Sequence, residues 1–380
     1  MEPIDDETQD KLSILHLIVS LGESNAQYNE HCLPLRDQRD IAICSYTPAA
    51  VSVPPTIRLF EGDGTIRGFA RAMDRAFADR IYDVVHAHAP GSAAMLVFEN
   101  LLKRRPMSNA VLTVHNSRES FSLRSQLLLP ILFAAFPTVV FCSNAAMVSF
   151  STNMRKLAGD VVVVPNGVDT VRIDRVLAGA NPVPRGADFH VVCVGRLIPR
   201  KDPHAVLQAL ALVAEGSDRL TFIGDGRMRG EVLEAARRSG LRVDVPGTVA
   251  REDVYRTLSN ADLFVSASRH EGLPIAVLEA MACGIPVVMS DIGPHREIKA
   301  RSEFPRMVPP GDVAGLAREI RRSRAMGPGE RRILGAGCRA IVDRRFDLAS
   351  MHRGYGRVYD RLRRRSRKQS DPISTGRDLG

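Results

Sequence analysis

Two glutamates interrupt an otherwise apolar stretch, "HEGLPIAVLEAMACGIPVV" at residues 270–288, with seven residues between Glu271 and Glu279. A carboxylate buried without a partner costs several kcal/mol, so each glutamate needs a group to bind. The two neighbouring hydroxyls of a ribose can both donate to Glu279, and the hydroxyls of a second sugar can reach Glu271 beside the flexible Gly272. The alternative for Glu279 is an ion pair with an arginine of the core.

Two cations stand at the end of another apolar run, in "VVCVGRLIPRKDP" (residues 191–203). Arg196 follows the run directly, and Lys201 lies five residues further on, before a predicted helix. At the carboxyl end of a strand, such a pair can neutralise a diphosphate together with the N–H groups of the helix. The alternative is two solvated surface charges, but the strand-end position and the glutamate pair favour the diphosphate.

A glycine-rich turn, "FIGDGRM" at residues 222–228, ends the next predicted strand. Its glycines let the backbone approach a ligand closely, although Asp-Gly turns are common. The chain has no Asp-x-Asp triplet, whereas sites that bind a diphosphate through Mg²⁺ or Mn²⁺ usually use such carboxylates. We therefore expect no metal ligands and no cofactor.

Histidines end two strands of the first half. His115 closes residues 110–116 and could donate a hydrogen bond to a sugar, or could be a satisfied core or loop histidine. His86 and His88 alternate within residues 82–88, which places both on one face of the strand. For these two, core packing and contact with a second substrate remain equally open.

Short β-branched runs alternate with helical patterns along the chain, which is typical of parallel sheets covered on both faces. The predicted strands are residues 12–20, 41–46, 56–61, 82–88, 110–116, 138–143, 161–167, 189–196, 220–226, 241–247, 263–268, 285–290 and 306–310. The predicted helices include residues 65–80, 91–104, 202–215, 227–239 and 312–325. The chain thus has the α/β class: two doubly wound, Rossmann-like domains that face each other across a deep cleft.

The alternation of predicted strands and helices is interrupted once, at residues 170–188, which contain Gly, Pro and Asn but no predicted strand. We expect a linker there. The predicted divisions are an N-terminal domain at 11–169, the linker at 170–188, a C-terminal domain at 189–343, a last helix at 344–365 that packs back on the first domain, and a basic disordered tail at 366–380.

The stretch at residues 270–288 resembles the Glu–seven residues–Glu signature of the retaining family 4 glycosyltransferases, which have the GT-B fold. Further segments match this family in order, at residues 113–116, 164–169, 191–203 and 222–228. The resemblance covers roughly residues 12–362 and is more specific in the second domain. In the first, the turn "VSLGESNAQYN" (19–29) has only Gly22 where many members have two adjacent glycines.

The resemblance implies transfer of a sugar, with retained configuration and without a metal, from a nucleotide diphosphate sugar to an acceptor hydroxyl. It assigns the catalytic roles to His115, Glu271, Arg196 and Lys201. It assigns donor binding to Gly22, Arg196, Lys201, Gly224, Asp225, Gly226, Val245, Glu271, Gly272, Leu273 and Glu279. Other GT-B activities, such as an epimerase or a phosphorylase, are the alternatives.

Charge and amino-acid composition limit the classes of molecule that the protein is expected to bind. The net charge is +9, but residues 361–368, "RLRRRSRK", carry six of the basic groups. That tail is the only support for a nucleic-acid-binding protein, and aromatics are just 5%, so we expect no nucleic acid. The partners implied instead are a nucleotide sugar and an acceptor that is a sugar, a lipid-linked glycan or a small molecule.

The location predicted from the sequence is the cytoplasm. The acidic start "MEPIDDETQD" has no apolar h-region, no run is long enough to span a membrane, and the six cysteines lack metal or redox spacing. Residues 120–136 most resemble a core helix; the alternative is an amphipathic membrane contact. Peripheral contact with an anionic membrane at its inner face, through this helix or the basic tail, stays open.

Overall fold

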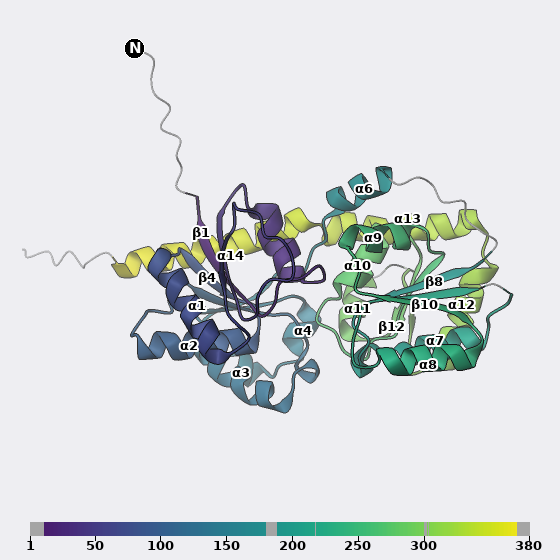
Figure 1. Cartoon of the computed structure of the whole chain (residues 1–380), viewed down its shortest axis with the longest axis horizontal. Coiled ribbons are helices and arrows are strands. Elements are labelled where there is room, and N and C mark those ends of the chain that lie inside the picture. Colours follow the sequence, from purple (N-terminus) through teal and green to yellow (C-terminus); the bar gives the residue numbers. More distant parts are fainter. Residues whose placement is uncertain (1–10, 180–187, 217, 300–301, 303, 371–380) are drawn as a thin grey trace, which may run out of the picture.

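The computed structural model describes residues 11–179, 188–216, 218–299, 302 and 304–370. The predicted acidic start and the tail beyond residue 370 lie outside these residues. Two parallel sheets form two α/β domains side by side (Figure 1). The predicted fold class is confirmed, and each predicted strand coincides with an observed one.

The N-terminal sheet has the order β3-β2-β1-β4-β5-β6-β7. Its strands are β1 (Ser13–Ile18), β2 (Asp40–Ser45), β3 (Arg58–Glu61), β4 (Val84–Ala87), β5 (Ala110–Val114), β6 (Thr138–Phe141) and β7 (Val161–Val163). All six residues of β1 are buried, because helices cover both faces of the sheet. The order reverses between β1 and β4, and such a switch point opens a crevice at the carboxyl ends of the strands.

The C-terminal sheet repeats this plan with the order β10-β9-β8-β11-β12-β13. Its strands are β8 (His190–Val194), β9 (Arg219–Ile223), β10 (Arg242–Gly247), β11 (Leu263–Ser266), β12 (Val287–Ser290) and β13 (Arg306–Val308). Here the switch point lies between β8 and β11. The carboxyl ends of β8 and β11 therefore present the segments that carry Arg196 and Glu271 to the same edge of the sheet.

The helices fill the intervals between strands. In the first domain they are α1 (Ile66–Asp79), α2 (Pro90–Leu102), α3 (Leu123–Ala135), α4 (Asn144–Val148), α5 (Thr152–Arg155) and the π-helical turn η1 (Gln27–Cys32). In the second they are α7 (Pro203–Ala211), α8 (Arg229–Ser239), α9 (Arg251–Ser259), α10 (Ile275–Ala282), α11 (Gly293–Lys299), α12 (Val313–Ala325) and α13 (Pro328–Arg345). Side-chain caps mark several starts; for example, Thr65 accepts from the N–H of Gly68 at 2.9 Å. Among the described residues, no helix is long and apolar enough to cross a membrane.

The predicted linker contains a helix, α6 (Thr170–Ala178). The sequence did not predict this helix because the glycines and prolines of residues 170–188 favoured a loop. Asp169 caps α6 by accepting from the N–H of Arg172 at 2.8 Å. The helix packs against α9, and Arg172 donates to Glu252 from its Nε at 3.1 Å. The first part of the linker is therefore bound to the second domain.

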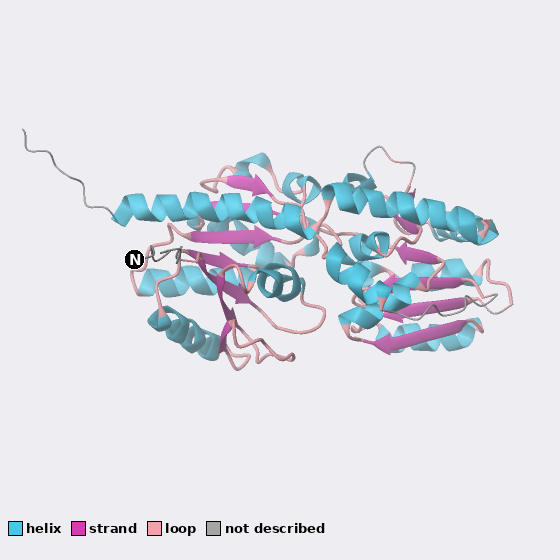
Figure 2. Cartoon of the chain, turned by 90° about the horizontal axis from the view of Figure 1, so that it is seen from above, coloured by secondary structure: helices cyan, strands magenta, loops and turns pink. Residues whose placement is uncertain are grey.

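The last helix, α14 (Leu348–Ser370), returns to the first domain and lies along it (Figures 1 and 2). It runs five residues past the predicted end at 365. Its buried side chains Met351, Tyr355, Tyr359 and Leu362 share a hydrophobic cluster with Ile14, Ile43 and Val111 of the first sheet. The chain thus passes between the domains twice. The two passages are paired side by side: Val168 and Asp347 form a β-bridge.

The prediction that residues 120–136 are core is only half right. The helix α3 buries Leu129, Leu132 and Phe133, but it exposes Leu123, Leu127 and Ile131. Its apolar residues occupy both sides, so no periodicity in the sequence marked which side faces outward.

Candidate functional site

The cleft between the domains holds two adjoining chambers. The larger, of about 470 Å³, is lined mainly by the second domain, including Arg196, Lys201 and Glu279. The smaller, of about 260 Å³, adds His115 of the first domain and Glu271. Arg196 and Lys201 line both chambers, so they stand where a ligand would pass from one to the other.

Three cations follow strand β8. Arg196 is exposed to the cleft, and Arg200 and Lys201 occupy the 3₁₀ turn before α7. Asp202 then adopts a left-handed conformation, with φ of 48°, and lies in reach of the Arg269 Nε, which donates to its Oδ2 at 2.9 Å. This turn aims the side chains of Arg200 and Lys201 at the cleft rather than along α7.

Lys201 and Glu271 form an ion pair across the cleft floor. Burial would raise the pKa of Glu271, but the charge of Lys201 and hydrogen bonds from Lys201 and Ser268 outweigh it and lower that pKa. Glu271 is therefore an ionised carboxylate although it is buried.

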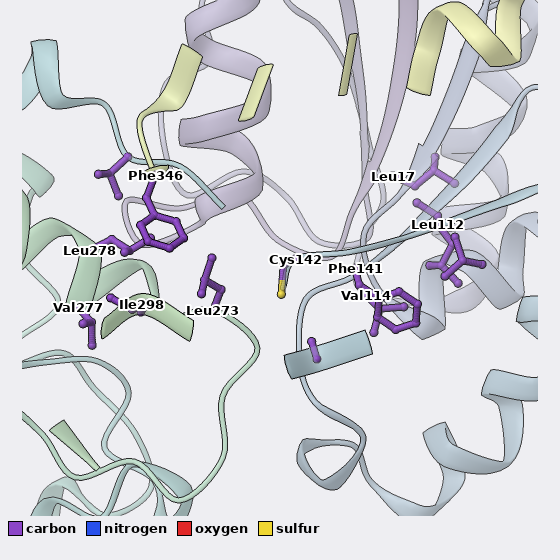
Figure 3. Close-up of a cluster of buried hydrophobic side chains, with 14 of the residues drawn as sticks. Leu17, Leu112, Val114, Phe141, Cys142, Leu273, Val277, Leu278, Ile298 and Phe346 are labelled. Atoms are coloured by element: carbon purple, nitrogen blue, oxygen red, sulfur yellow. The ribbon is translucent and has the colours of Figure 1, made fainter. Parts of the chain in front are cut away.

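The loop that carries Glu271 is bonded to the first domain. The Ser117 N–H donates to the Glu271 carbonyl at 3.3 Å, Ser143 Oγ donates to the Gly272 carbonyl at 2.7 Å, and Asn166 Nδ2 donates to the Leu273 carbonyl at 2.8 Å. A Cβ at residue 272 would lie 2.0 Å from the carbonyl oxygen of His115, so only glycine fits there. Figure 3 shows Leu273 of the second domain and Cys142 of the first as members of one cluster of buried hydrophobic side chains.

Glu279 has the arginine partner that the sequence left as the alternative. Arg251 Nη2 lies 2.7 Å from Glu279 Oε1, and Tyr255 donates to the same oxygen at 3.1 Å. Arg251 also pairs with Glu30, which lies in η1 of the first domain. All three charged side chains are buried.

Because the contacts that Glu279 makes among the described residues fall on Oε1, its Oε2 stays available to a ligand in the larger chamber. For Glu30, by contrast, the second carboxylate oxygen is enclosed: its Oε2 is buried and has no hydrogen-bond partner in the described parts of the chain. Burial raises the pKa of Glu30 to about 7, and the nearby Arg251 only partly offsets this.

The glycine-rich turn closes the larger chamber at β9. Gly224 has φ of 132°, and a Cβ there would lie 2.2 Å from the Gly195 carbonyl oxygen. Gly224 and Asp225 line the chamber. Gly226 supports the turn from behind, with its Cα against the backbone of Leu197.

Besides Gly226, two predicted donor-binding residues lie outside the chamber walls. Val245 packs against the core of its domain, and its carbonyl accepts from Arg229 Nη2 at 3.3 Å. The wall at that edge is formed by Thr248 and Val249 instead. On the other side, Gly22 lies just before the residues that line the chamber, Glu23, Ser24 and Ala26.

His115 lies at the end of β5 and lines the smaller chamber together with Glu271, as the strand pattern predicts. Burial lowers its pKa to about 4, so its imidazole is neutral. Its Nε2 bonds the Nδ1 of His88 at 3.1 Å. Among the two ring nitrogens, Nδ1 is the one left for a ligand.

Comparison with known proteins gives the family. The model described as "Glycosyltransferase Family 4" matches residues 22–172, and the model described as "Glycosyl transferases group 1" matches residues 188–324. Together they take in both domains and the walls of the cleft. This chain is a family 4 glycosyltransferase.

Its relatives agree with this assignment. A phosphatidyl-myo-inositol mannosyltransferase of Mycobacterium leprae is 28% identical over 75% of each chain. Among solved structures, sucrose-phosphate synthase from Thermosynechococcus elongatus has a TM-score of 0.75 at 20% identity, covering 92% of this chain and 99% of that one. HepE of Anabaena, solved with UDP, has a TM-score of 0.69 at 21% identity over 92% and 100%. At such identities the structures confirm the GT-B fold.

The glycosyltransferase also has site residues that the sequence did not indicate. Arg200 lines the larger chamber and donates to Asn116 Oδ1 of the first domain at 3.1 Å; its place beside Lys201 was the only available signal. Arg251 lines the same chamber. It begins α9 in a segment rich in charged residues, so nothing local distinguished it from a surface arginine.

Proposed function

We propose that the enzyme transfers a sugar, with retained configuration and without a metal, from a nucleotide diphosphate sugar to an acceptor hydroxyl. One observation carries the proposal. Within the larger chamber, cations and a carboxylate stand at different walls, with Arg196 and Lys201 beside β8 and Glu279 on α10. A diphosphate needs the first kind of group and a ribose diol the second.

The roles follow from the order of groups along the cleft. The ribose binds Glu279 Oε2, and the diphosphate lies against Arg196 and Lys201. The sugar then extends into the smaller chamber between Glu271 and His115. As the sugar–phosphate bond breaks, negative charge builds up on the diphosphate, and fixed cations beside it stabilise the transition state more than the ground state.

Retention is proposed without a covalent enzyme intermediate. The Glu271 carboxylate is engaged by Lys201, and His115 is neutral and hydrogen-bonded. The departing diphosphate itself is then the base that takes the proton of the acceptor hydroxyl on the same face of the sugar. In this scheme the two cations take the place of a metal ion.

The experiment has two stages. A thermal-shift screen against a panel of nucleotide diphosphate sugars finds the donor, because a ligand that binds only the folded protein raises its apparent stability. Proton NMR of the product formed with that donor then gives the anomeric configuration. An inverted product would refute retention, and a panel without any stabilising ligand would refute the donor site.

The proposed metal independence is tested in the same assay with EDTA. Activity should be unchanged after chelation and dialysis, since Arg196 and Lys201 carry the charge compensation. Loss of activity on chelation together with recovery on addition of Mn²⁺ would overturn this part of the proposal.

We further propose that the acceptor lies at an anionic membrane surface. The helices α2 and α3 pack side by side on one flank of the first domain (Figure 1) and expose the large apolar side chains Phe98, Leu101, Leu102, Leu123, Leu127 and Ile131. Arg104, just past the end of α2, and Arg124, near the start of α3, are exposed and belong to no ion pair among the described residues. Apolar groups beside unpaired cations match anionic lipid. The M. leprae relative is named for a phosphatidyl lipid.

Vesicle sedimentation tests this surface. The protein should sediment with vesicles of phosphatidylglycerol and phosphatidylcholine and less with phosphatidylcholine alone. The double variant Leu123→Ser/Leu127→Ser should lose most of this binding. The control is Ile333→Ser, because Ile333 is equally exposed on α13 of the other domain. Equal binding by both variants would refute the proposal.

A further inference from the structure

Three histidines from neighbouring strands form a continuous row that ends at the cleft. His16 lies in β1, His88 directly follows β4, and His115 directly follows β5. His16 Nδ1 is 2.9 Å from His88 Nε2, and His88 Nδ1 is 3.1 Å from His115 Nε2. Each ring of the row therefore uses one nitrogen for each neighbour, as in a chain of imidazoles.

The orientation of the rings suits hydrogen bonds. The planes of His16 and His88 differ by 17°, and those of His88 and His115 by 20°. The ring centroids are 5.2 Å and 5.4 Å apart, whereas the hydrogen-bonded nitrogens are only 2.9 Å and 3.1 Å apart. The nitrogens therefore lie between the ring centres, and the rings meet edge to edge rather than face to face. In this geometry the N–H of one ring points along the lone pair of the next.

None of the three imidazole rings in the row carries a second proton, so none is cationic. Burial lowers the pKa of His16 to about 3 and that of His115 to about 4, and it holds the pKa of His88 well below its usual range. Each ring is thus neutral, with one N–H and one lone pair. The rings must then all point their N–H groups the same way along the row, since two lone pairs or two protons cannot face each other.

A metal ion is the competing reading, because nitrogens of His16, His86 and His88 lie within 4.8 Å of one another. However, both nitrogens of His86 already have partners: Nδ1 bonds the Tyr359 hydroxyl at 2.8 Å, and Nε2 bonds Thr113 Oγ1 at 2.7 Å. Both nitrogens of His88 are used within the row. A metal would have to break several of these buried bonds.

The far end of the row decides its direction. His16 Nε2 is buried and has no hydrogen-bond partner within the part of the chain that the structure describes. A buried N–H without an acceptor is rarer in proteins than a buried acceptor without a donor, so the unpartnered nitrogen carries the lone pair. His16 then donates from Nδ1 to His88, and His88 donates from Nδ1 to His115.

We propose that His16 and His88 hold His115 as its Nδ1–H tautomer, so that His115 presents a hydrogen-bond donor, and not a base, to the sugar in the smaller chamber. This inference rests on the proposed function for the identity of the ligand, but the tautomer itself does not. His88 and His16 are positioning residues, since they act through His115.

The tautomer can be measured without any substrate. In protein with ¹⁵N-labelled histidine rings, two-bond ¹H–¹⁵N correlation spectra distinguish the Nδ1–H from the Nε2–H form, and loss of a signal in His115→Asn assigns it. The wild-type protein should show His115 as the Nδ1–H form. An Nε2–H form or a cationic ring would overturn the proposal, whether or not sugar transfer has been found.

Two substitutions of His88 test its hydrogen bonds to His115 and to His16 one at a time. An asparagine amide occupies the place of the imidazole Nδ1, so His88→Asn keeps a donor toward His115. A glutamine amide reaches the place of Nε2, so His88→Gln keeps only the contact with His16. His88→Gln should release the tautomer and lower kcat about tenfold, as expected for one hydrogen bond, while His88→Asn stays near wild type. The affinity for uridine and guanosine diphosphates should change in neither.

The control is His86→Asn, on the same strand and equally buried but outside the row. It should lower thermal stability without altering the His115 tautomer. If His88→Gln keeps the wild-type tautomer, or shifts it no more than His86→Asn does, the proposal fails. Stoichiometric zinc in the wild-type protein that is lost in His88→Gln would also overturn it in favour of a metal site.

Discussion

The two sides of the cleft differ in charge. The side from the second domain presents the acidic and basic side chains of Arg196, Lys201, Glu271 and Glu279. The side from the first domain presents His115 and, behind it, further histidines that burial keeps neutral. Under the proposed function, we expect the charged wall to bind the diphosphate of the donor and the neutral wall to contact the hydroxyls of its sugar.

Two carboxylates of the first domain break this division. Glu23 lines the larger chamber, and Glu30 is the exception that connects the two sides. Glu30 comes from the first domain but reaches Arg251 and, through it, Glu279 of the second. The predictions below probe the charged wall, the shared arginine and this exception, in order of decreasing effect.

Arg251→Leu should have the largest effect, a loss of about 3–5 kcal/mol of stability, because it leaves Glu30 and Glu279 buried without a cation. Thermal unfolding measures it. The control is Arg256→Leu on the same helix, where the exposed pair with Asp253 contributes roughly 0–1 kcal/mol. Similar losses in the two variants would mean that Arg251 does not join the two sides.

Lys201→Ala should lower kcat/KM about 100-fold, equivalent to about 3 kcal/mol, because one charge-assisted contact to the diphosphate is lost in the transition state. Arg196→Ala should act similarly, while the affinity for the bare nucleoside holds. Lys201→Ala also leaves Glu271 without its ionic partner. The double variant Lys201→Ala/Glu271→Gln removes that buried charge and so isolates the effect of the lost contact to the diphosphate. Arg237→Ala, at an exposed site on α8, is the control. Turnover near wild type would place the diphosphate elsewhere.

Glu279→Gln should weaken nucleotide binding about tenfold, the value of one hydrogen bond to a charged group. Folding should change little, because Arg251 keeps Glu30 as its ionic partner. Titration calorimetry with a nucleoside diphosphate and its 2′-deoxy and 3′-deoxy analogues gives the sharper result. The wild type should prefer the ribose, and Glu279→Gln should not. A preference that survives the substitution would exclude Glu279 as the ribose contact.

The smallest effect is a pH dependence from Glu30. Its pKa in the folded protein is about 7, above the ordinary value of 4.5, so the folded state holds this proton more tightly than the unfolded state. The contribution of Glu30 to stability is therefore full below pH 4.5 and is lost as the pH rises to about 7. In Glu30→Gln, the midpoint temperature of unfolding should depend less on pH between 4.5 and about 7 than it does in the wild type. An unchanged slope would show that the carboxyl is ionised in the folded protein.

The sequence predicted most of the fold because each strand is a short apolar run bounded by turn residues, as in "IPVVMS" around β12. It also located Glu279 on a helix, because Pro274 and Gly284 bracket α10, and Gly284 has the positive φ of 71° expected after a helix end. Local patterns were sufficient for such elements, and the family resemblance placed them in one site.

Local patterns could not predict the pairings. Glu30 and Arg251 are 221 residues apart in the chain, so neither neighbourhood reveals the other. The histidine row likewise exists only because β1, β4 and β5 become neighbours in the sheet. The roles of Arg196, Lys201 and Glu271 stay predictions, since the geometry brings them together without a ligand.

The path of α14 has a consequence for how the protein is made. One face of the first sheet is covered by Met351, Tyr355, Tyr359 and Leu362, which follow the whole second domain in the chain and leave the ribosome after it. The domain that is synthesised first thus cannot bury that face until the whole second domain has been translated. We expect the nascent first domain to need chaperone protection during this interval, because exposed strands with apolar faces aggregate. A stop codon just before residue 348 would leave this face of the first domain uncovered, although the codon lies after the second domain.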